Sequence, residues 1–462
     1  MLPTALSTFF NQFQQQHPEL AADIGALSLV DRKAVSGDRI VKMLVVQDSL
    51  GRLQVLFPAH CLIDIDTLNG QLGRELVILP DAELAKLQQR HGMTELPAIP
   101  GLTGLPTVLD ERLQQAGEAY LEIGQADHLL RLSGPLYQAL TSLARPLKYA
   151  VPIRSIDINR DDPAQDLEQI NRAISQFTRL RIQQRLQDTL ELPPLPETAH
   201  RVMKLRVDPD AGIAELADIV ETDPSLSAQV VSWASSSYYA APGRIRSVYD
   251  AIMRVLGFDL VMNLAMGLSL GRTLKQPNDA PAGFTPYWQQ AVWMATTVSA
   301  LSTTIPRAHR PEFGLCYLSG LLHNFGYLVL AHIFPPHFSL MCRYAECNPH
   351  LDPAYIEHFL LGITREQIGS KLMALWNMPD EVVVALRQQK SPFYEGEHAA
   401  YAGLLFVATQ MLRQQGLVDG PALPIPAALY QQLHLDPEEA EDALREILES
   451  SDALTSMANS LG

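Results

Sequence analysis

The chain has 462 residues, enough for two to three domains, and its 47% hydrophobic and 19% charged residues exclude an intrinsically disordered protein. Its net charge is −16, of which residues 1–160 carry −3 (14 basic against 17 acidic residues) and the remainder −13 (21 against 34). An acidic C-terminal part repels a phosphate backbone, so nonspecific nucleic-acid binding is not expected there, whereas the nearly neutral N-terminal part leaves it open.

The four cysteines are too scattered for a disulfide framework or a zinc site, so we expect free thiols. The first twenty residues lack the basic start and unbroken apolar core of a secretory signal. The most apolar long run, near Leu315 to Ile333, is interrupted by His323, Asn324 and His332, which favours a buried helix over a membrane span. We therefore expect a soluble, cytoplasmic protein that does not enter a membrane.

Residues 1–150 are predicted to form a mixed α/β domain. An amphipathic helix is expected from about Leu6 to His17, followed by short apolar strands separated by turns. The segments RIVKMLVVQD and RLQVLFP, joined at Ser49-Leu50-Gly51, predict a hairpin. Residues 96–106 are rich in proline and glycine, so we expect a loop there.

The rest of the chain is predicted to be helical. Residues 151–190 form a linker and a connecting helix, which begins near Asp166 and either ties the domains together, the reading we favour, or forms a dimer seam. Residues 191–415 form an all-helical domain, and residues 416–462 an acidic helical tail. Because residues 435–462 hold eight acidic residues and one basic residue, we expect a solvated helix or a frayed end there.

One basic residue, Lys42, lies within an otherwise apolar predicted strand. Pattern alone favours a lysine whose ammonium reaches solvent from an exposed strand face. The functional alternative is a fixed ammonium at a pocket, where it would hold a phosphate or a carbonyl oxygen that develops negative charge.

The residues around Lys42 favour the second alternative. The stretches RIVKMLVV, LPTVLDERL and YLEIGQADHLLRL make roughly residues 20–145 resemble the editing domain of bacterial prolyl-tRNA synthetases and of their free-standing YbaK-like relatives, which deacylate mischarged tRNA. The resemblance implies a catalytic or substrate-orienting role for Lys42. It also implies substrate-binding positions in the loop and strand that follow: Gly101, Gly104, Pro106 and Asp110.

Two departures from that family bear on activity. The family usually has threonine after the lysine, whereas this chain has Met43. The family's paired glycines, which let backbone amides approach a substrate, are replaced by Thr94-Glu95-Leu96-Pro97. The resemblance therefore supports the fold more strongly than the activity.

Roughly from Leu192 to Leu412 the chain resembles the HDOD family, the HD-related output domain of bacterial signalling proteins. The signs are the Leu-Pro-x-Leu-Pro opening, the helix start at Asp223-Pro224 and the element that ends at Leu256-Gly257. The resemblance implies an HD-like helical bundle. The expected fold is thus a YbaK-like α+β domain followed by an all-α HDOD domain.

The HD superfamily holds one or two metal ions through several histidines and a His-Asp pair, which activate water against a phosphoester. The residues that take those places in this chain are Gln290, His323, Asn324, Arg365, Gln388 and Gln389. A single imidazole does not retain a metal, and Arg365 puts a permanent positive charge at the site. We therefore expect no metal, no cofactor and no phosphohydrolase activity.

These six polar residues are expected either to satisfy one another in a buried network or to line a pocket for a small polar or anionic ligand. We favour the network, because nothing in the sequence names a ligand.

Two functions remain open. The first, which we favour, is a regulatory protein in which a YbaK-like domain, with aminoacyl-tRNA or a related ligand, is coupled to a metal-free HDOD output module. The second is a trans-editing aminoacyl-tRNA deacylase with the HDOD part as an interaction appendage. Other signalling proteins are the expected partners, tRNA is a further candidate at the N-terminal domain, and oligomerisation is compatible with both functions.

Overall fold

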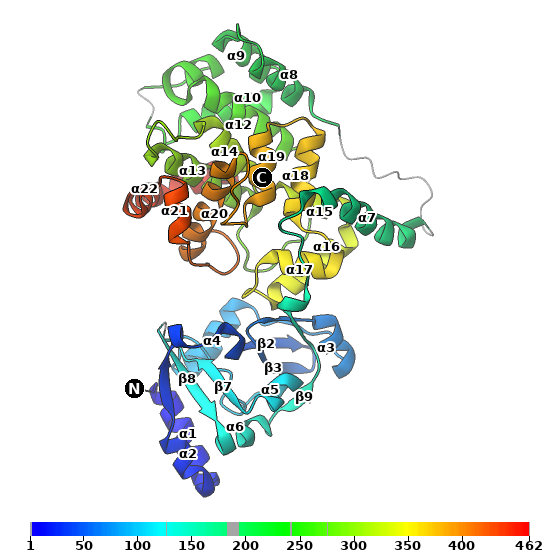
Figure 1. Cartoon of the computed structure of the whole chain (residues 1–462), viewed down its shortest axis with the longest axis vertical. Coiled ribbons are helices and arrows are strands. Elements are labelled where there is room, and N and C mark those ends of the chain that lie inside the picture. Colours follow the sequence, from blue (N-terminus) through cyan, green and yellow to red (C-terminus); the bar gives the residue numbers. More distant parts are fainter. Residues whose placement is uncertain (1, 126, 183–193, 241–242, 275, 462) are drawn as a thin grey trace. The chain divides into compact units, whose positions relative to one another are not determined.

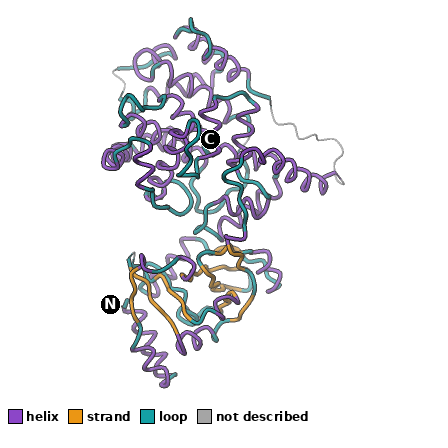
Figure 2. The backbone as a smooth tube through the Cα atoms, in the orientation of Figure 1, coloured by secondary structure: helices purple, strands orange, loops and turns teal. Residues whose placement is uncertain are grey.

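The computed structural model describes residues 2–125, 127–182, 194–240, 243–274 and 276–461 (Figure 1). The chain divides into two compact units. The first unit comprises Met1–Asp157, Pro281–Gly283 and Leu340–Ile356, and the second comprises Ile158–Ala280, Phe284–Ser339 and Glu357–Gly462. In the described part of the chain all strands belong to the first unit and the second is built of helices and loops (Figure 2), which confirms the expected order of an α+β and an all-α domain.

The first unit is built on a mixed sheet. Among the described residues, eight strands form it in the order β1-β8-β7-β2-β3-β6-β9, with β5 paired to β2, while β4 and β10 form a separate pair. The strands are β1 Ser28–Asp31, β2 Ile40–Asp48, β3 Gly51–Pro58, β4 Cys61–Ile63, β5 Val77–Ile78, β6 Thr107–Asp110, β7 Glu118–Glu122, β8 His128–Ser133, β9 Arg145–Leu147 and β10 Ala150–Pro152.

Strands β2 and β3 form the hairpin that the sequence predicts. They are antiparallel, with Lys42 directly opposite Phe57 and Asp48 opposite Gly51. Strand β2 also runs parallel to β7, where Val41 is level with Leu121. Because side chains alternate between the two faces of a sheet, this register places Lys42 and Glu122 side by side on one face.

Helices of the first unit bury the opposite face of the sheet. Phe10 and Phe13 of the N-terminal helix share a hydrophobic core with Val45 and Leu121 of the sheet and with Leu140 of α6. The helices are α1 Thr4–Gln16, α2 Ala21–Gly25, α3 Ile65–Leu72, α4 Asp81–His91, α5 Glu111–Gln115 and α6 Gly134–Thr141. The predicted opening amphipathic helix is therefore confirmed to within two residues.

A segment from much later in the chain, Leu340–Ile356, packs into this first unit. The side chain of Asn348 forms two hydrogen bonds with the backbone of Ile63: it accepts from the N–H at 2.7 Å and donates to the carbonyl oxygen at 3.1 Å. The hydroxyl of Tyr344 donates to Asp64 at 2.7 Å. Asn348 thus satisfies the edge of β4 as a neighbouring strand would.

Among the remaining helices, α13 packs against α14, α20, α22 and α23. A π-helical turn, Ile252–Leu256, follows α11. The helices are α7 Asp166–Ile182, α8 Glu197–Arg206, α9 Ile213–Glu221, α10 Pro224–Ala234, α11 Val248–Ala251, α12 Phe258–Gly271, α13 Tyr287–Thr304, α14 Phe313–Leu322, α15 Phe325–Ile333, α16 Pro335–Cys347, α17 Pro353–Leu361, α18 Arg365–Leu375, α19 Asp380–Gln388, α20 Ala399–Gln414, α21 Ala427–Gln432, α22 Pro437–Glu449 and α23 Ser451–Asn459.

The most apolar stretch, Phe313–Ile333, is long and apolar enough to cross a membrane by length and composition alone, but 89% of its most apolar window is buried inside the protein. It consists of α14 and α15, which are separated at His323 and Asn324. The expectation of a buried core helix is confirmed.

The start of the connecting helix α7 is anchored in the second unit. Asp166 is buried and receives two hydrogen bonds from the guanidinium of Arg387, one of them at 3.0 Å, and another from the Gln367 amide at 2.8 Å. The predicted continuation of this helix to Leu190 lies partly outside the described residues.

Residues 435–462 are helical, as expected, but they are neither a fully solvated helix nor a frayed end. They form α22 and α23, which pack against α13. The acidic residues of α22 alternate with Leu444 and Ile447, which are buried, and Leu454 and Met457 of α23 are buried as well. Counting charges hides this pattern, because an amphipathic helix carries its charges on the exposed face only.

Close packing of α15 against α18 depends on a glycine. A Cβ added at Gly326 would overlap the backbone carbonyl of Arg365. We expect Gly326→Ala to force these helices apart and to lower the free energy of unfolding of the second unit by about 1–3 kcal/mol, the range for overpacked cores. Chemical denaturation followed by circular dichroism measures this change.

The matched control is Gly70→Ala in α3 of the first unit, where an added Cβ meets nothing within 4 Å. This substitution is expected to leave the unfolding of the second unit unchanged. An equal effect of both substitutions would contradict the packing argument.

Candidate functional site

Lys42 belongs to an ion-pair cluster on the sheet. Its Nζ lies 2.6 Å from one carboxylate oxygen of Glu122, and the guanidinium of Arg32 lies 2.5 Å from the other. Burial alone would raise the pKa of Glu122, but the hydrogen bonds and charges of Lys42 and Arg32 hold it below its usual range. The Lys42 side chain is 28% exposed, so the ammonium is paired and still reaches solvent.

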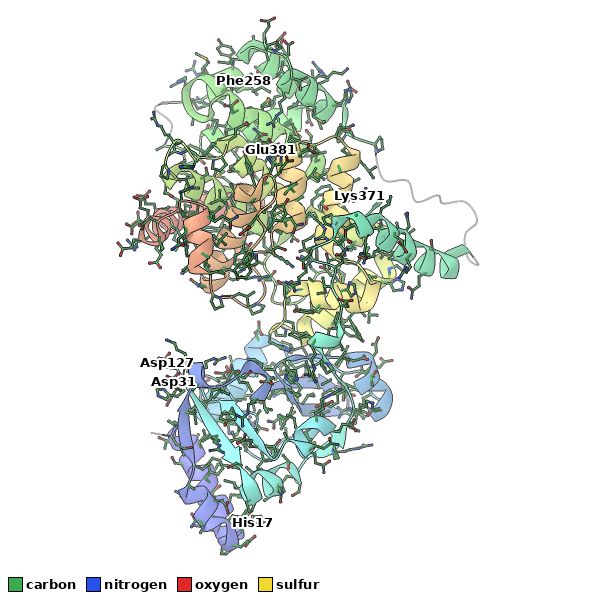
Figure 3. All side chains as sticks on the ribbon, in the orientation of Figure 1. His17, Asp31, Asp127, Phe258, Lys371 and Glu381 are labelled. Atoms are coloured by element: carbon green, nitrogen blue, oxygen red, sulfur yellow. The ribbon has the colours of Figure 1, made fainter. Side chains whose placement is uncertain are left out.

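Arg32 enters this cluster from the edge of the sheet. It directly follows β1, and its N–H donates to the carbonyl oxygen of Asp127 at 2.9 Å, before β8. Figure 3 shows Asp31 and Asp127 next to each other at this edge. The fold therefore fixes the backbone that carries the second cation.

Glu95 stands at the rim of the cluster. A Cβ added at Gly124 would lie 2.7 Å from the Thr94 hydroxyl and 3.6 Å from the Glu95 Cβ, so residues 94–95 pack directly on this glycine. Desolvation and the neighbouring carboxylate of Glu122, with which Glu95 shares a hydrogen bond, raise the pKa of Glu95. A carboxyl group thus stands where the resembled editing domains have paired glycines. We use the name Lys42 cluster for Arg32, Lys42, Glu95 and Glu122.

The predicted substrate loop lies over the other face of the sheet. Gly101 and Gly104 have left-handed backbone conformations, with φ of 83° and 69°. The carbonyl oxygen of Pro106 accepts from the backbone N–H of Gln54 at 2.9 Å. The Gln54 side chain contacts Met43, whose side chain points away from the face that carries Lys42. This loop therefore lies near Met43, on the face of the sheet opposite to the Lys42 ammonium.

Asp110 is fully buried, and its carboxylate accepts hydrogen bonds from backbone N–H groups. One of its carboxylate oxygens accepts from the N–H groups of Tyr149 and Ala150 at 3.1 and 2.9 Å, and the other accepts from the N–H of Arg112 at 3.2 Å. It therefore caps α5 and secures the chain before β10. These contacts give Asp110 a structural role.

In the second unit, Arg365 is one of the residues that the sequence resemblance assigns to the HD metal-ligand positions. Its guanidinium forms an ion pair with Glu357, which is fully buried, and donates to the side-chain oxygen of Asn324 at 2.7 Å. It also lies over the ring of Tyr327, 5.1 Å from the centroid. Burial raises the pKa of Glu357, an effect that the charge of Arg365 opposes. We call Asn324, Glu357 and Arg365 the Arg365 network.

His323 lies beside this network and is held by backbone. Its Nδ1 donates to the carbonyl oxygen of Gly320 at 2.8 Å, and its own carbonyl oxygen accepts from the Gln389 amide at 2.9 Å. Burial lowers the pKa of His323 to about 4. The imidazole is therefore neutral near pH 7, and its partner is the backbone. Gln388 is also buried, at the end of α19.

Gln290 has partners of its own in the second unit. Its amide donates to Asp419 at 2.7 Å and to the carbonyl oxygen of Thr285 at 2.8 Å. Burial raises the pKa of Asp419, and the charge of Arg365 acts against this rise. Gln290, His323, Asn324, Arg365 and Gln389 therefore each have a hydrogen-bond partner, and Arg365 is paired with Glu357.

The residues present do not fit a metal ion of the HD type. Asn324 offers a neutral oxygen that already accepts from Arg365, and Glu357 is paired with the same guanidinium. Within the described ranges, no three His, Cys, Asp or Glu side chains come together in a way that could hold a metal ion. A hard divalent cation needs several negatively charged oxygens free to bind it.

Sequence reasoning missed the acidic partners at both centres. Glu357 is a lone acid in the apolar run AYIEHFLLGI, which is a local signal for a buried pair. Glu122 lies within the predicted strand stretch YLEIG and Glu95 directly precedes the predicted loop, and neither stands in a distinguishing pattern. The contacts of Asp419 with Gln290 and of His350 with Cys61 join residues far apart in the sequence, which a linear pattern does not show.

Comparisons with known proteins match both halves. An HDOD domain model matches residues 192–392, and an aminoacyl-tRNA editing domain model matches residues 22–140. The crystal structure of a proposed signal transduction protein from Marinobacter aquaeolei VT8 is 47% identical to this chain, has a TM-score of 0.90 and covers 100% of both chains. This full-length likeness includes the order of the two halves.

Two more distant relatives each resemble part of the chain. An HDOD domain protein with unknown function from Geobacter sulfurreducens is 20% identical, covers 64% of this chain and 98% of its own, and has a TM-score of 0.46. An uncharacterized protein from Treponema pallidum (strain Nichols) is 22% identical over 264 residues, or 56% of this chain. The chain spans about half the length of that curated relative (50%).

The Arg365 network yields a stability prediction. Arg365→Met leaves the Glu357 carboxylate buried without a cation, so we expect a loss of about 3–5 kcal/mol in the free energy of unfolding. The double variant Arg365→Met/Glu357→Leu removes the orphaned charge and is expected to recover most of that loss. Arg445→Met, at an exposed pair with Asp442, serves as control and should change stability by less than about 0.5 kcal/mol. A double variant no more stable than the single one would contradict the pairing.

His323 yields a prediction on pH dependence. Its pKa is about 4 in the folded protein against 6.5 for an unperturbed histidine. Between these values the unfolded chain binds more protons, so this contribution to stability is complete above pH 6.5 and is lost as the pH falls toward 4. His323→Asn, which keeps a donor for Gly320, is expected to flatten this part of the profile. Denaturation curves at pH 7 and pH 5 test it, and parallel profiles for the two proteins would refute it.

Proposed function

Because this chain belongs to the HDOD family and carries an aminoacyl-tRNA editing domain in its N-terminal half, we propose that it is a bacterial regulatory protein whose editing-like domain binds an aminoacyl group and whose helical module acts in signalling without a metal. The pairing of both Lys42 and Arg32 with Glu122 is the observation that carries the proposal. The full-length likeness to the Marinobacter protein, whose name is that of a proposed signal transduction protein, supports it.

The charges of the Lys42 cluster favour binding over hydrolysis. A deacylase gains rate when a cation or N–H group stabilises the oxyanion that forms on the ester carbonyl. Here a carboxylate 2.6 Å from the ammonium already offsets that charge, and Glu95 stands at the rim. A binding site needs only complementary groups, and an aminoacyl group offers an ammonium for the carboxylates and a carbonyl oxygen for the cations.

A working trans-editing deacylase is the second candidate. One observation favours it: Lys42 keeps the strand position that the lysine has in the resembled family, and its side chain is 28% exposed. In this alternative a substrate would displace Glu122 from the ammonium and use the freed charge.

The deciding experiment measures binding and hydrolysis of a panel of aminoacyl-tRNAs, with uncharged tRNA for comparison, on the full-length protein. We expect charged tRNA to bind more tightly than uncharged tRNA, Lys42→Ala to weaken that preference about tenfold, equivalent to roughly 1.4 kcal/mol, and ester hydrolysis to stay at the spontaneous rate.

Lys33→Ala is the matched control, because Lys33 is an exposed lysine of the same unit, close to Arg32 in sequence. It should leave both measurements unchanged. Hydrolysis that disappears in Lys42→Ala would establish the deacylase instead. Equal binding of charged and uncharged tRNA would refute recognition of the aminoacyl group.

A further inference from the structure

His350 lies on the same face of the sheet as Lys42, although it comes from the helical half of the sequence. Phe57 is directly opposite Lys42 in the β2–β3 register, and the His350 ring lies over the Phe57 ring with centroids 5.0 Å apart. All three residues belong to the first compact unit, which includes Leu340–Ile356. Glu122 and Lys42 are both close enough to act electrostatically on the imidazole.

The surrounding contacts hold His350 in place. Its Nε2 is bonded to the carbonyl oxygen of Cys61 at 3.0 Å. Two residues earlier, Asn348 is bonded twice to the backbone of Ile63, and Tyr344 is bonded to Asp64. A side chain supported in this way meets a ligand at little further entropic cost.

The bond to Cys61 also decides the tautomer. A carbonyl oxygen only accepts hydrogen bonds, so the Nε2 of His350 carries the proton and its Nδ1 carries the lone pair. Burial lowers the pKa of His350 to about 4, so the ring is neutral near pH 7. His350 therefore has one unprotonated ring nitrogen, and its ring packs on Phe57, which lies on the face of the sheet that carries Lys42.

We propose that His350 is a ligand-binding residue of the Lys42 site, which is therefore built from strands β2 and β7 together with the segment Leu340–Ile356. The proposal rests on the proposed function, in which this site binds an aminoacyl group. Lys42 and Arg32 match the carbonyl oxygen of such a group, and Glu122 and the Nδ1 of His350 match its ammonium.

The composite site has a consequence for ligand binding by an isolated editing-like domain. An editing-like domain cut from this chain before the helical half would lack His350 and would bind the same group more weakly. Recognition at Lys42 then depends on residues whose sequence lies between helices of the HDOD domain.

The test uses full-length protein labelled with ¹⁵N-histidine and a panel of amino-acid amides, which carry the ammonium and carbonyl of an aminoacyl group. Binding to the wild type should shift the His350 Nδ1 resonance. His350→Phe keeps the packing on Phe57 but loses the acceptor, so we expect about tenfold weaker binding. His350→Gln, with one amide donor for Cys61 and one oxygen acceptor, should retain most of the affinity.

A second measurement needs no ligand. The charge of Lys42 lowers the pKa of His350 and that of Glu122 raises it, so Lys42→Met should raise this pKa and Glu122→Gln should lower it. A pKa that neither substitution moves would overturn the composite site.

The outcomes separate the two proposals. Failure of every amide to bind the wild type would refute the proposed function, and the composite site with it. Binding to the wild type that His350→Phe leaves unchanged would refute only the role of His350, and the function proposed for Lys42 would stand.

Discussion

The ion pair between Arg365 and the fully buried Glu357 is the constraint on which the centre of the helical module depends. A carboxylate without contact with water must be neutralised, and here the cation is a guanidinium from the start of α18. The same guanidinium fixes Asn324 at the start of α15, and Gly326 lets these helices approach closely enough for that bond. The guanidinium of Arg365 thereby links the start of α18 to Glu357 in α17 and to Asn324 before α15.

Pairing of buried charges also occurs at other places in the protein. Asp166 and Arg387 hold the first turn of α7 in the second unit, and Glu122 joins two cations in the first. Charges engaged in this way favour binding and scaffolding over catalysis, because a reaction needs a group whose charge is available when the transition state forms.

The predictable part of the fold is the part that local patterns encode. Alternation of apolar residues predicts the β2–β3 hairpin, and helical periodicity predicts the helices of the second unit, because these follow from backbone geometry. Residues 435–462 show the limit of a charge count, since Leu444 and Ile447 carry the periodicity that buries α22. The partners of Lys42 and Arg365 depend on contacts between distant segments. Of these partners, only Glu357 is recognisable from the local sequence, because it is a single acidic residue in an apolar run.

The docking of Leu340–Ile356 on β4 also governs the order in which the molecule is made. The ribosome completes the sheet-forming residues through Asp157 roughly 180 residues before it reaches Leu340. At a translation rate of about 5–20 residues per second, Asn348 is therefore synthesised on the order of 10–40 s after the sheet-forming residues, and β4 lacks this contact until then. Throughout that interval the backbone of Ile63 lacks its final partner. The N-terminal half therefore completes its packing only after its own synthesis has ended. The speed of translation through the helical half sets the length of this delay.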